Sequence, residues 1–252
     1  MIDIKIFHFH FYKNAGSSVD AILKSVFNNK WEQREFEGSD HWPLINTWLE
    51  FSKDIICYSS HTANLDIINN QKFELFPIIF ARHPIDRIAS MYRYEKIQRG
   101  NEWEYKLART SSMRQYIQAR LDRINDVQCR NFHCNRLAEL YRSSNKLERS
   151  DLTLAQNTIK ILPFIGIVER FQSSLDVLRY QLERITSLRA HLGETQENAT
   201  FNLSTPLDIR LEQIKHEIGS ELFEELIKIN QNDLLIYELI ARKLDAQFTN
   251  LY

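Results

Sequence analysis

The chain has 252 residues, 43% of them hydrophobic and 26% charged, which is typical of a globular protein that can bury a full core. Its 32 basic and 33 acidic residues give a net charge of −1, so overall charge does not direct it to nucleic acid or to a membrane surface, and any anion site must be local. The sequence contains no apolar run of about 18 residues, signal peptide, repeat or low-complexity linker. We therefore expect a single domain over residues 1–252, located in the cytoplasm and without a transmembrane segment.

Strands and helices are predicted to alternate along the chain. Residues 4–12 predict a strand with two apolar faces, and 18–28 predict a helix with its apolar residues at helical spacing. Strands follow at 54–59 and 76–81, and Pro84 then stands at the first position of a helix, where proline is favoured. The remaining pattern predicts an apolar run at 161–168 and helices near 104–122, 127–142, 170–187, 206–228 and 231–246.

This alternation predicts an α/β fold in three layers, with a central, mostly parallel sheet flanked by helices. In such sheets ligands bind beyond the carboxyl ends of the strands. The turns that leave the first and third predicted strands are therefore the places to look for chemistry.

The first turn (13–18) has the composition of a phosphate-binding turn, with Lys13, Asn14, Ala15, Gly16, Ser17 and Ser18 in order. Glycine permits close approach of a ligand or a positive φ, the serines can cap the helix that follows, and the free amides of that helix attract anions. An ordinary turn with a surface lysine and a serine cap would have the same composition. The lysine precedes the glycine, unlike the order G-x-x-x-x-G-K-S/T of magnesium-dependent nucleotide-binding loops.

The second turn (82–90) begins with Arg82 at the end of the third predicted strand and reaches Ser90 on the second turn of the next helix. Helical side chains lean toward the helix N-terminus, so we expect Ser90 to point back toward Arg82 and to form a second anion site with it. Arg87 either adds to this site or pairs with Asp86 or Glu95, and pairing is the reading we favour.

Two anion sites on neighbouring turns suit a nucleotide with phosphates at two positions, and here the sequence resembles the sulfotransferases that use 3′-phosphoadenosine 5′-phosphosulfate (PAPS), especially their carbohydrate branch. "FHFYKNAGSSVDAIL" is similar to the family's 5′-phosphosulfate loop, and "IIFARHPIDRIASMYRY" to its 3′-phosphate motif R-D-P-x-x-R-x-x-S-x-Y. "IGIVERFQSSLDVLR" and "INQNDLLIYELI" resemble two later family segments. Asn14 and Ser17 stand where the family usually has threonine, and His83 where it has aspartate, which leaves the cap of that helix in doubt.

The resemblance implies a P-loop-NTPase-like domain that transfers a sulfuryl group from PAPS to an acceptor hydroxyl, leaves PAP as product and needs no metal. It further implies that Lys13 stabilises the departing phosphate, that residues 14–18 hold the 5′ end, and that Arg82 and Ser90 hold the 3′-phosphate. The branch implies a carbohydrate acceptor: a polysaccharide, an oligosaccharide or a glycolipid.

His61, just after the second predicted strand, is the candidate catalytic base, because the carbohydrate branch commonly has a histidine there and imidazole titrates near neutrality. A loop histidine with a structural hydrogen bond is the alternative. His8 and His10 share one face of the first strand and are expected to be buried, hydrogen-bonded core residues, and Glu50 is a weaker candidate base.

Other residues leave two readings open. The tryptophans either stack on sugar rings or pack a connection onto the core: Trp31, Trp42, Trp48 and Trp103. Four arginines either bind an acidic polysaccharide or, as we expect, lie on solvated helix faces: Arg120, Arg123, Arg130 and Arg136. The three cysteines are expected to be buried thiols: Cys57, Cys129 and Cys134.

Three other functions compete with sulfuryl transfer. A kinase or nucleotidase on a related fold would require Mg²⁺, a non-catalytic module would bind PAP without turnover, and an interaction protein would leave the two anion turns unexplained. The sequence does not distinguish among acceptors or fix the oligomeric state.

Overall fold

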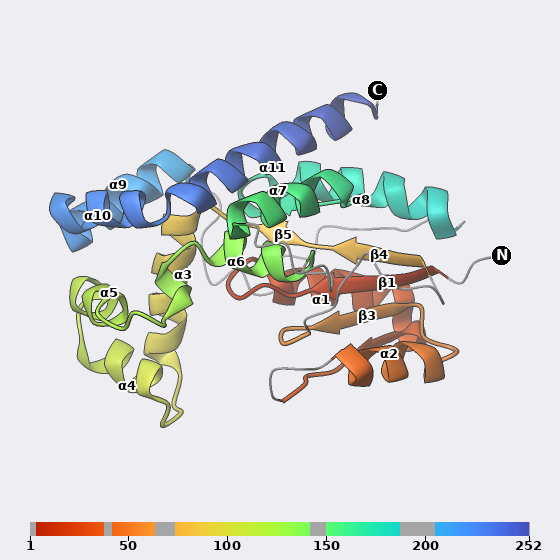
Figure 1. The fold of residues 1–252 in the computed structure, drawn as a ribbon, viewed down its shortest axis with the longest axis horizontal. Helices are drawn as coiled ribbons and strands as arrows, with labels where there is room; N and C mark the ends of the chain where they lie inside the picture. Colours follow the sequence, from red (N-terminus) through yellow and green to blue (C-terminus); the bar gives the residue numbers. More distant parts are fainter. Residues whose placement is uncertain (1–3, 38–41, 64–73, 142–149, 187–204, 252) are drawn as a thin grey trace.

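The structure is a computed structural model, and it describes residues 4–37, 42–63, 74–141, 150–186 and 205–251. At its centre is a parallel sheet with the strand order β2-β3-β1-β4 (Figure 1). Its strands are β1 (Ile4–Phe9), β2 (Trp31–Gln33), β3 (Cys57–Ser60) and β4 (Glu74–Ile78). The chain of β4 continues into β5 (Phe80–Ala81), which pairs in parallel with β6 (Gly166–Ile167).

Strand β1 lies between β3 and β4, with His8 opposite Ser59 on one side and Ile78 on the other. Ile6, Phe7 and Phe9 are at most 1% exposed, so both faces of the strand are covered, as its apolar sequence predicts. The predicted α/β fold with a central parallel sheet flanked by helices is confirmed.

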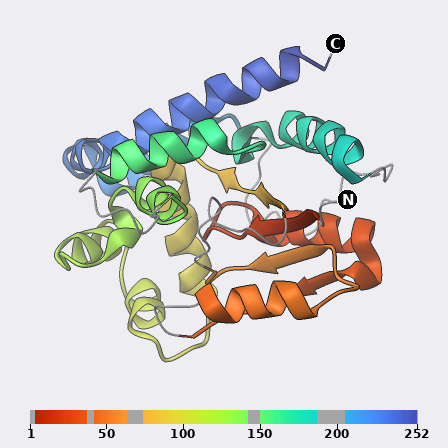
Figure 2. The same cartoon turned by 45° about the vertical axis from the view of Figure 1, so that its right-hand side comes forward.

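Helices cover the sheet and extend beyond its carboxyl edge. In Figures 1 and 2, helix α2 lies beside β3. On the side of β4 and β5 lie the helices α7, α8 and α11. A helical lobe past the end of the sheet is formed by α3, α4, α5, α9 and α10. The helices are α1 (Gly16–Phe27), α2 (Trp42–Phe51), α3 (Pro84–Ile97), α4 (Trp103–Thr110), α5 (Met113–Leu121), α6 (Phe132–Glu139), α7 (Asp151–Ile161), α8 (Phe171–Thr186), α9 (Leu207–Ile218), α10 (Ser220–Ile229) and α11 (Gln231–Thr249).

Several predicted boundaries are wrong for local reasons. The helix predicted at 104–122 is two helices, because Ser112 and Gln115 form a capping box that starts α5. The helix predicted at 206–228 is also two, because Gly219 has a φ of 86° and separates α9 from α10. Strand β2 and helices α2 and α7 were not predicted; β2 is only three residues long, and its one apolar residue, Trp31, gives no periodic signal.

A buried polar chain joins the C-terminal helix to both turns. Asp233, at the start of α11, accepts hydrogen bonds from the amides of His133 (3.0 Å) and Cys134 (2.8 Å), and its Oδ2 lies 3.0 Å from Nδ1 of His133. The other ring nitrogen of His133 lies 2.9 Å from Oδ1 of Asn14 and accepts from the amide of Arg82 at 3.5 Å. One imidazole thus contacts the first and the second turn.

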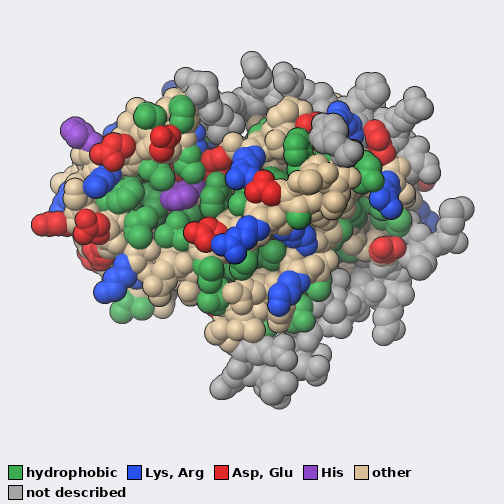
Figure 3. Space-filling model, turned by 90° about the horizontal axis from the view of Figure 1, so that it is seen from above, with side chains coloured by type: hydrophobic (Ala, Val, Ile, Leu, Met, Phe, Trp, Pro, Cys, Tyr) green, Lys and Arg blue, Asp and Glu red, His purple; other side chains and the backbone are tan. Residues whose placement is uncertain are grey.

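The surface carries no dominant charge on the face seen from above α11, where acidic and basic side chains are scattered among apolar ones (Figure 3). The described helices include none that combines the length and apolarity needed to cross a membrane. All three cysteines are free and buried, as predicted.

Candidate functional site

Strands β1 and β3 run parallel and end at the same edge of the central sheet, and the first turn leaves this edge after β1; the second turn follows β5 of the two-stranded sheet. Lys13 and Ala15 have φ values of 64° and 60°, a left-handed conformation that costs a non-glycine residue about 1 kcal/mol and tends to occur at functional sites. Helix α1 begins at Gly16 with Ala15 at its N-cap and no side-chain cap. The predicted serine cap is therefore wrong, and of the two roles expected for Gly16 the positive φ is excluded.

Gly16 is needed instead for close packing. A Cβ at this position would lie 1.8 to 2.3 Å from three ring atoms of His10, which is far inside van der Waals contact. The glycine thus makes room for an imidazole of the protein, so the ring lies directly against the start of α1.

The start of α1 presents unpaired backbone donors. The amides of Ser18 and Val19 both donate to the carbonyl of Ala15, at 3.1 Å. Within the described part of the chain, the amides of Ala15, Gly16 and Ser17 reach no protein acceptor. Donors of this kind at a helix N-terminus attract an anion.

Lys13 and Arg82 bring two cations to this place. The guanidinium of Arg82 donates to the carbonyl of Lys13 at 3.4 Å, and Nζ of Lys13 lies 4.0 Å from the ring centroid of Tyr94 on α3. Burial and the charge of Arg82 lower the pKa of Lys13 to about 8, while Glu95 opposes the shift. The ammonium is therefore held where it is disfavoured without an anion.

The carboxylate of Asp86 orients the guanidinium of Arg82. It accepts from Nε of Arg82 at 2.7 Å and from two nitrogens of Arg210 on α9 at 3.1 and 3.0 Å, and it is fully buried. Burial would raise the pKa of Asp86, but Arg82 and Arg210 lower it, so the carboxylate is ionised and shared by two cations. Ser90 is buried one helical turn further along α3, at the i+4 position from Asp86.

Two expectations for the second turn are resolved by the contacts. Arg87 pairs with neither Asp86 nor Glu95: its guanidinium stacks over Phe132 at 4.1 Å and donates to the carbonyl of Gln128, so it does not add to the anion site. His83 stands at the N-cap of α3 without a side-chain cap, and its amide donates to Glu169 at 2.9 Å instead.

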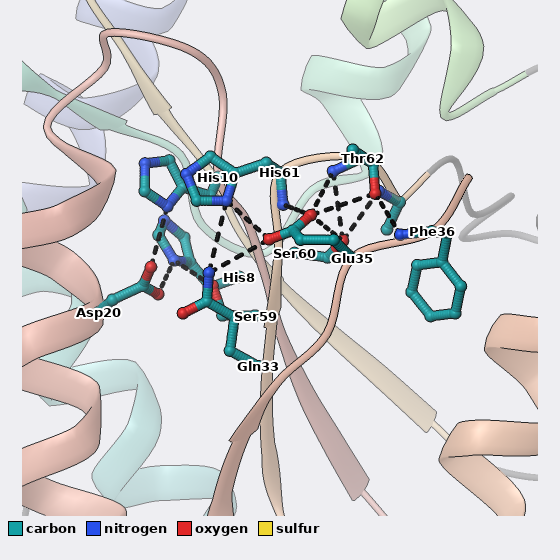
Figure 4. Close-up of polar contacts among 11 residues, drawn as sticks. His8, His10, Asp20, Gln33, Glu35, Phe36, Ser59, Ser60, His61 and Thr62 are labelled. Carbon is teal, nitrogen blue, oxygen red and sulfur yellow. Dashed lines mark hydrogen bonds and ion pairs between the residues drawn. The ribbon is translucent and has the colours of Figure 1, made fainter. Parts of the chain in front are cut away.

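His61 follows β3 and is paired with Glu35, which follows β2 (Figure 4). Its Nδ1 lies 2.7 Å from Oε1 of Glu35, while Oε2 accepts from the amides of His61 (2.9 Å) and Thr62 (3.1 Å). Burial would raise the pKa of Glu35, but hydrogen bonds from His61 and Gln33 lower it. An ionised carboxylate only accepts, so Nδ1 of His61 carries hydrogen and Nε2 is left to take a proton.

A second carboxylate holds two more imidazoles behind His61. Nδ1 of His8 lies 2.7 Å from Oδ1 of Asp20, and Nδ1 of His10 lies 2.9 Å from Oδ2 (Figure 4). The ring of His10 also stacks on His61, with centroids 3.6 Å apart and planes at 30°. His8 and His10 are 1% and 6% exposed, so the prediction that both are buried and hydrogen-bonded is confirmed.

His8, His10 and Asp20 are of types that hold metal ions, and their ligand atoms lie within 4.8 Å of one another. Two ligands on a tetrahedral zinc, each roughly 2.0–2.1 Å from the ion, are separated by about 3.3 Å. The nitrogen–oxygen distances of 2.7 and 2.9 Å are shorter and match charge-assisted hydrogen bonds. The arrangement therefore fits hydrogen bonding better than metal coordination.

The remaining candidates lie elsewhere. Trp48 is buried in the core against Phe7 and Tyr58, which favours packing over sugar stacking, and Trp103 is 40% exposed with Arg123 over its ring. Arg120 was expected on a solvated face but is buried. The ion pairs of its guanidinium with Glu95 and Asp126 account for this burial. The remaining candidates are placed as follows: Trp31 is half-buried on β2, Trp42 begins α2, Glu50 lies on α2, Arg130 donates to a backbone carbonyl, and Arg136 pairs with Glu139.

Three positions that shape the site were not predicted from the sequence: Glu35, Asp20 and His133. Glu35 follows a strand too short to predict, Asp20 lies on a helix face that the apolar pattern assigned to the core, and His133 meets the turns only through the fold. For Asp20 a signal was present, because helix spacing brings an acidic residue one turn after Gly16 back toward the strand that carries both histidines.

Comparison with known proteins agrees with this geometry. A family model described as the sulfotransferase family matches residues 3–239. A protein of Archaeoglobus fulgidus, itself described as uncharacterized, is 34% identical over 248 residues, which cover 94% of this chain and 95% of that relative.

The packing at Gly16 gives a first prediction. Gly16→Ala should lower the free energy of unfolding by about 1–3 kcal/mol, because a methyl group must displace the anchored ring of His10. Urea denaturation measures this. The double variant His10→Ala/Gly16→Ala is the control: with the ring of His10 removed, the added methyl should cost less than about 1 kcal/mol relative to His10→Ala alone. Equal stability of Gly16→Ala and the wild type would contradict the packing described.

Proposed function

The chain belongs to the sulfotransferase family, and we propose that it transfers the sulfuryl group of PAPS to a hydroxyl of a carbohydrate acceptor. The observation that carries the proposal is that Lys13 and Arg82 converge beside the unpaired backbone amides at the start of α1. Two cations held together against their mutual repulsion fit a ligand with several negative charges.

The donor would bind across both turns. The amides of Ala15, Gly16 and Ser17, with Lys13 and the hydroxyls of Ser17 and Ser18, would hold the 5′-phosphosulfate end. Asn14 would shape this turn rather than contact the donor, because it is 1% exposed and its amide, Nδ2 and Oδ1 contact Phe11, Tyr12 and His133. Arg82 and Ser90 would hold the 3′-phosphate. The contact of Arg82 with the carbonyl of Lys13 supports this division, because it puts the two turns side by side.

The reaction would proceed by in-line displacement at sulfur. The acceptor oxygen forms a bond to sulfur as the bond from sulfur to the 5′-phosphate oxygen breaks, and PAP leaves with the electron pair. Lys13 would stabilise the charge that develops on the departing oxygen. The acceptor proton would pass to Nε2 of His61, whose orientation the ionised Glu35 supports in the manner of a carboxylate–histidine pair.

A carbohydrate acceptor is the narrower part of the proposal. It is supported by the resemblance of the first turn and the His61 segment to the carbohydrate branch of the family. The exposure of the His61 and Glu35 side chains, 41% and 43%, leaves the base open to a large acceptor such as a polysaccharide, an oligosaccharide or a glycolipid.

Thermal unfolding with PAP, with ADP and with ATP plus Mg²⁺ tests the donor. At about a hundred times its dissociation constant, PAP should stabilise the protein by about 2.7 kcal/mol, which raises Tm by about 5–10 °C for a chain of this size. ADP lacks the 3′-phosphate and should give a smaller shift. A shift with ATP and Mg²⁺ and none with PAP would reject the proposal in favour of a kinase or nucleotidase.

The lowered pKa of Lys13 predicts how PAP affinity varies with pH. Below about pH 8 the ammonium is charged in the free protein; above it the charge is lost, so the dissociation constant of PAP should rise by up to about tenfold per pH unit between pH 8 and 9.5. Calorimetric titration measures it. Lys13→Arg should flatten the profile, because arginine stays charged. Lys106→Arg, on an exposed lysine of α4, should keep the wild-type slope, and an unchanged slope in Lys13→Arg would show that another group titrates.

Substitutions at His61 and Glu35 test the base. His61→Ala should lower kcat by about 10²- to 10⁴-fold, the usual contribution of a general base, and leave PAP affinity within about twofold. In Glu35→Gln, kcat should fall about 10-fold or more, because the neutral amide holds the imidazole less firmly than the carboxylate does. Sulfate transfer to a panel of saccharides measures the rate, with exposed His216→Ala as the control. Parallel loss of PAP affinity in His61→Ala would make His61 a structural residue.

A further inference from the structure

His10 is the side chain that contacts both the donor turn and the candidate base. One side of its ring packs on Gly16, where ring atoms lie 1.8 to 2.3 Å from the position a Cβ would take. A face of the ring stacks on His61, with centroids 3.6 Å apart. Figure 4 shows the two imidazoles side by side, each bonded to its own carboxylate.

The orientation of His10 is fixed from α1. Asp20 accepts from Nδ1 of His10 at 2.9 Å and from Nδ1 of His8 at 2.7 Å, and it lies on α1 one turn after Gly16. The helix whose N-terminus would hold the donor thus also anchors the ring that touches the base. Burial lowers the pKa of His10 and outweighs the hydrogen bond to Asp20, so the ring is neutral near pH 7 and adds no positive charge beside His61.

His61 needs a second restraint. Its side chain is 41% exposed, and its Nδ1 is tied to Glu35 by a hydrogen bond of 2.7 Å. Nδ1 also lies 3.4 Å from Nε2 of Gln33. Because both contacts are made at the same nitrogen, they leave the imidazole able to turn about an axis through that atom. Contact across the face of the ring removes that freedom, and His10 supplies this contact.

We infer that His10 is a positioning residue: a flat, anchored ring that orients His61 and sets its distance from the donor turn. The inference rests on the proposed function, since it concerns the base of that reaction. It predicts that the flat shape of the side chain matters at position 10, and that its ability to take up a proton does not.

Three variants separate this role from a structural one. In His10→Ala, kcat should fall by about 10²-fold, the usual effect of misplacing a catalytic group by about 1 Å, while the dissociation constant of PAP stays within about twofold. In His10→Phe, a flat ring is restored and kcat should return to within about fivefold of wild type. His8→Ala is the matched control, because His8 binds the same carboxylate and has no contact with His61 among the described residues.

Each outcome bears on the inference. A His10→Phe variant as slow as His10→Ala would overturn it, because the imidazole itself would then be required. An equal loss in His8→Ala would also overturn it, because the effect would then come from the Asp20 cluster as a whole. Circular dichroism and thermal unfolding verify that all three variants are folded at the assay temperature.

A measurement without turnover distinguishes this inference from the proposed function. The ring proton on Cε1 of His61 should show an upfield ring-current shift in proton NMR spectra of the wild type and of His10→Phe, and should lose it in His10→Ala. His61→Ala assigns the signal. Loss of the shift in His10→Ala supports the stacking role even if no acceptor is turned over. The absence of turnover would count against the proposed function alone. A shift that persists in His10→Ala overturns the inference even where wild-type transfer is fast.

Discussion

The contact between Asp233 and His133 is the constraint on which the site depends. Asp233 is fully buried at the start of α11. Burial would raise its pKa, but His133 and hydrogen bonds lower it. The carboxylate accepts from two backbone amides and so fixes the first turn of α6. The imidazole that it holds then contacts the side chain of Asn14 and the backbone of Arg82. Both turns are loops, and this imidazole joins them in addition to the contact of Arg82 with the carbonyl of Lys13.

The electrostatics of the edge follow from where carboxylates are placed. Asp86 is shared between Arg82 and Arg210, and Glu95 is occupied by Arg120, Tyr12 and Tyr116. Lys13 is left with an aromatic ring as its close partner, and its pKa is lowered. Around His61 the pattern is reversed, since Glu35 and Asp20 each orient imidazoles. The edge thus has a cationic half that suits an anionic donor and a carboxylate–imidazole half that suits proton transfer.

The sequence predicted what depends on local patterns. Alternating apolar runs gave the α/β sheet, and the first and second turns were located at the correct strand ends. The details failed where the tertiary structure decides them. Gly16 was expected to allow close approach of a ligand or a positive φ, and in the structure it accommodates the ring of His10. Arg87 was expected to pair with Asp86 or Glu95 or to join the anion site, but its guanidinium lies over Phe132. Glu35 was missed because the strand before it has only three residues. Packing of one side chain against another across the sheet leaves no periodic signal in one sequence.

The close packing of His10 on Gly16 also constrains how the family can diverge. Because no Cβ fits between the backbone at 16 and the imidazole at 10, a ring at position 10 in this orientation requires glycine at position 16. A relative with alanine or serine at the position of Gly16 should carry a smaller or differently directed side chain at the position of His10, and the residue at the position of His61 should then be supported by some other group. Residues 10 and 16 should therefore covary, and lineages that break this pair should show where the family has rebuilt the surroundings of this imidazole.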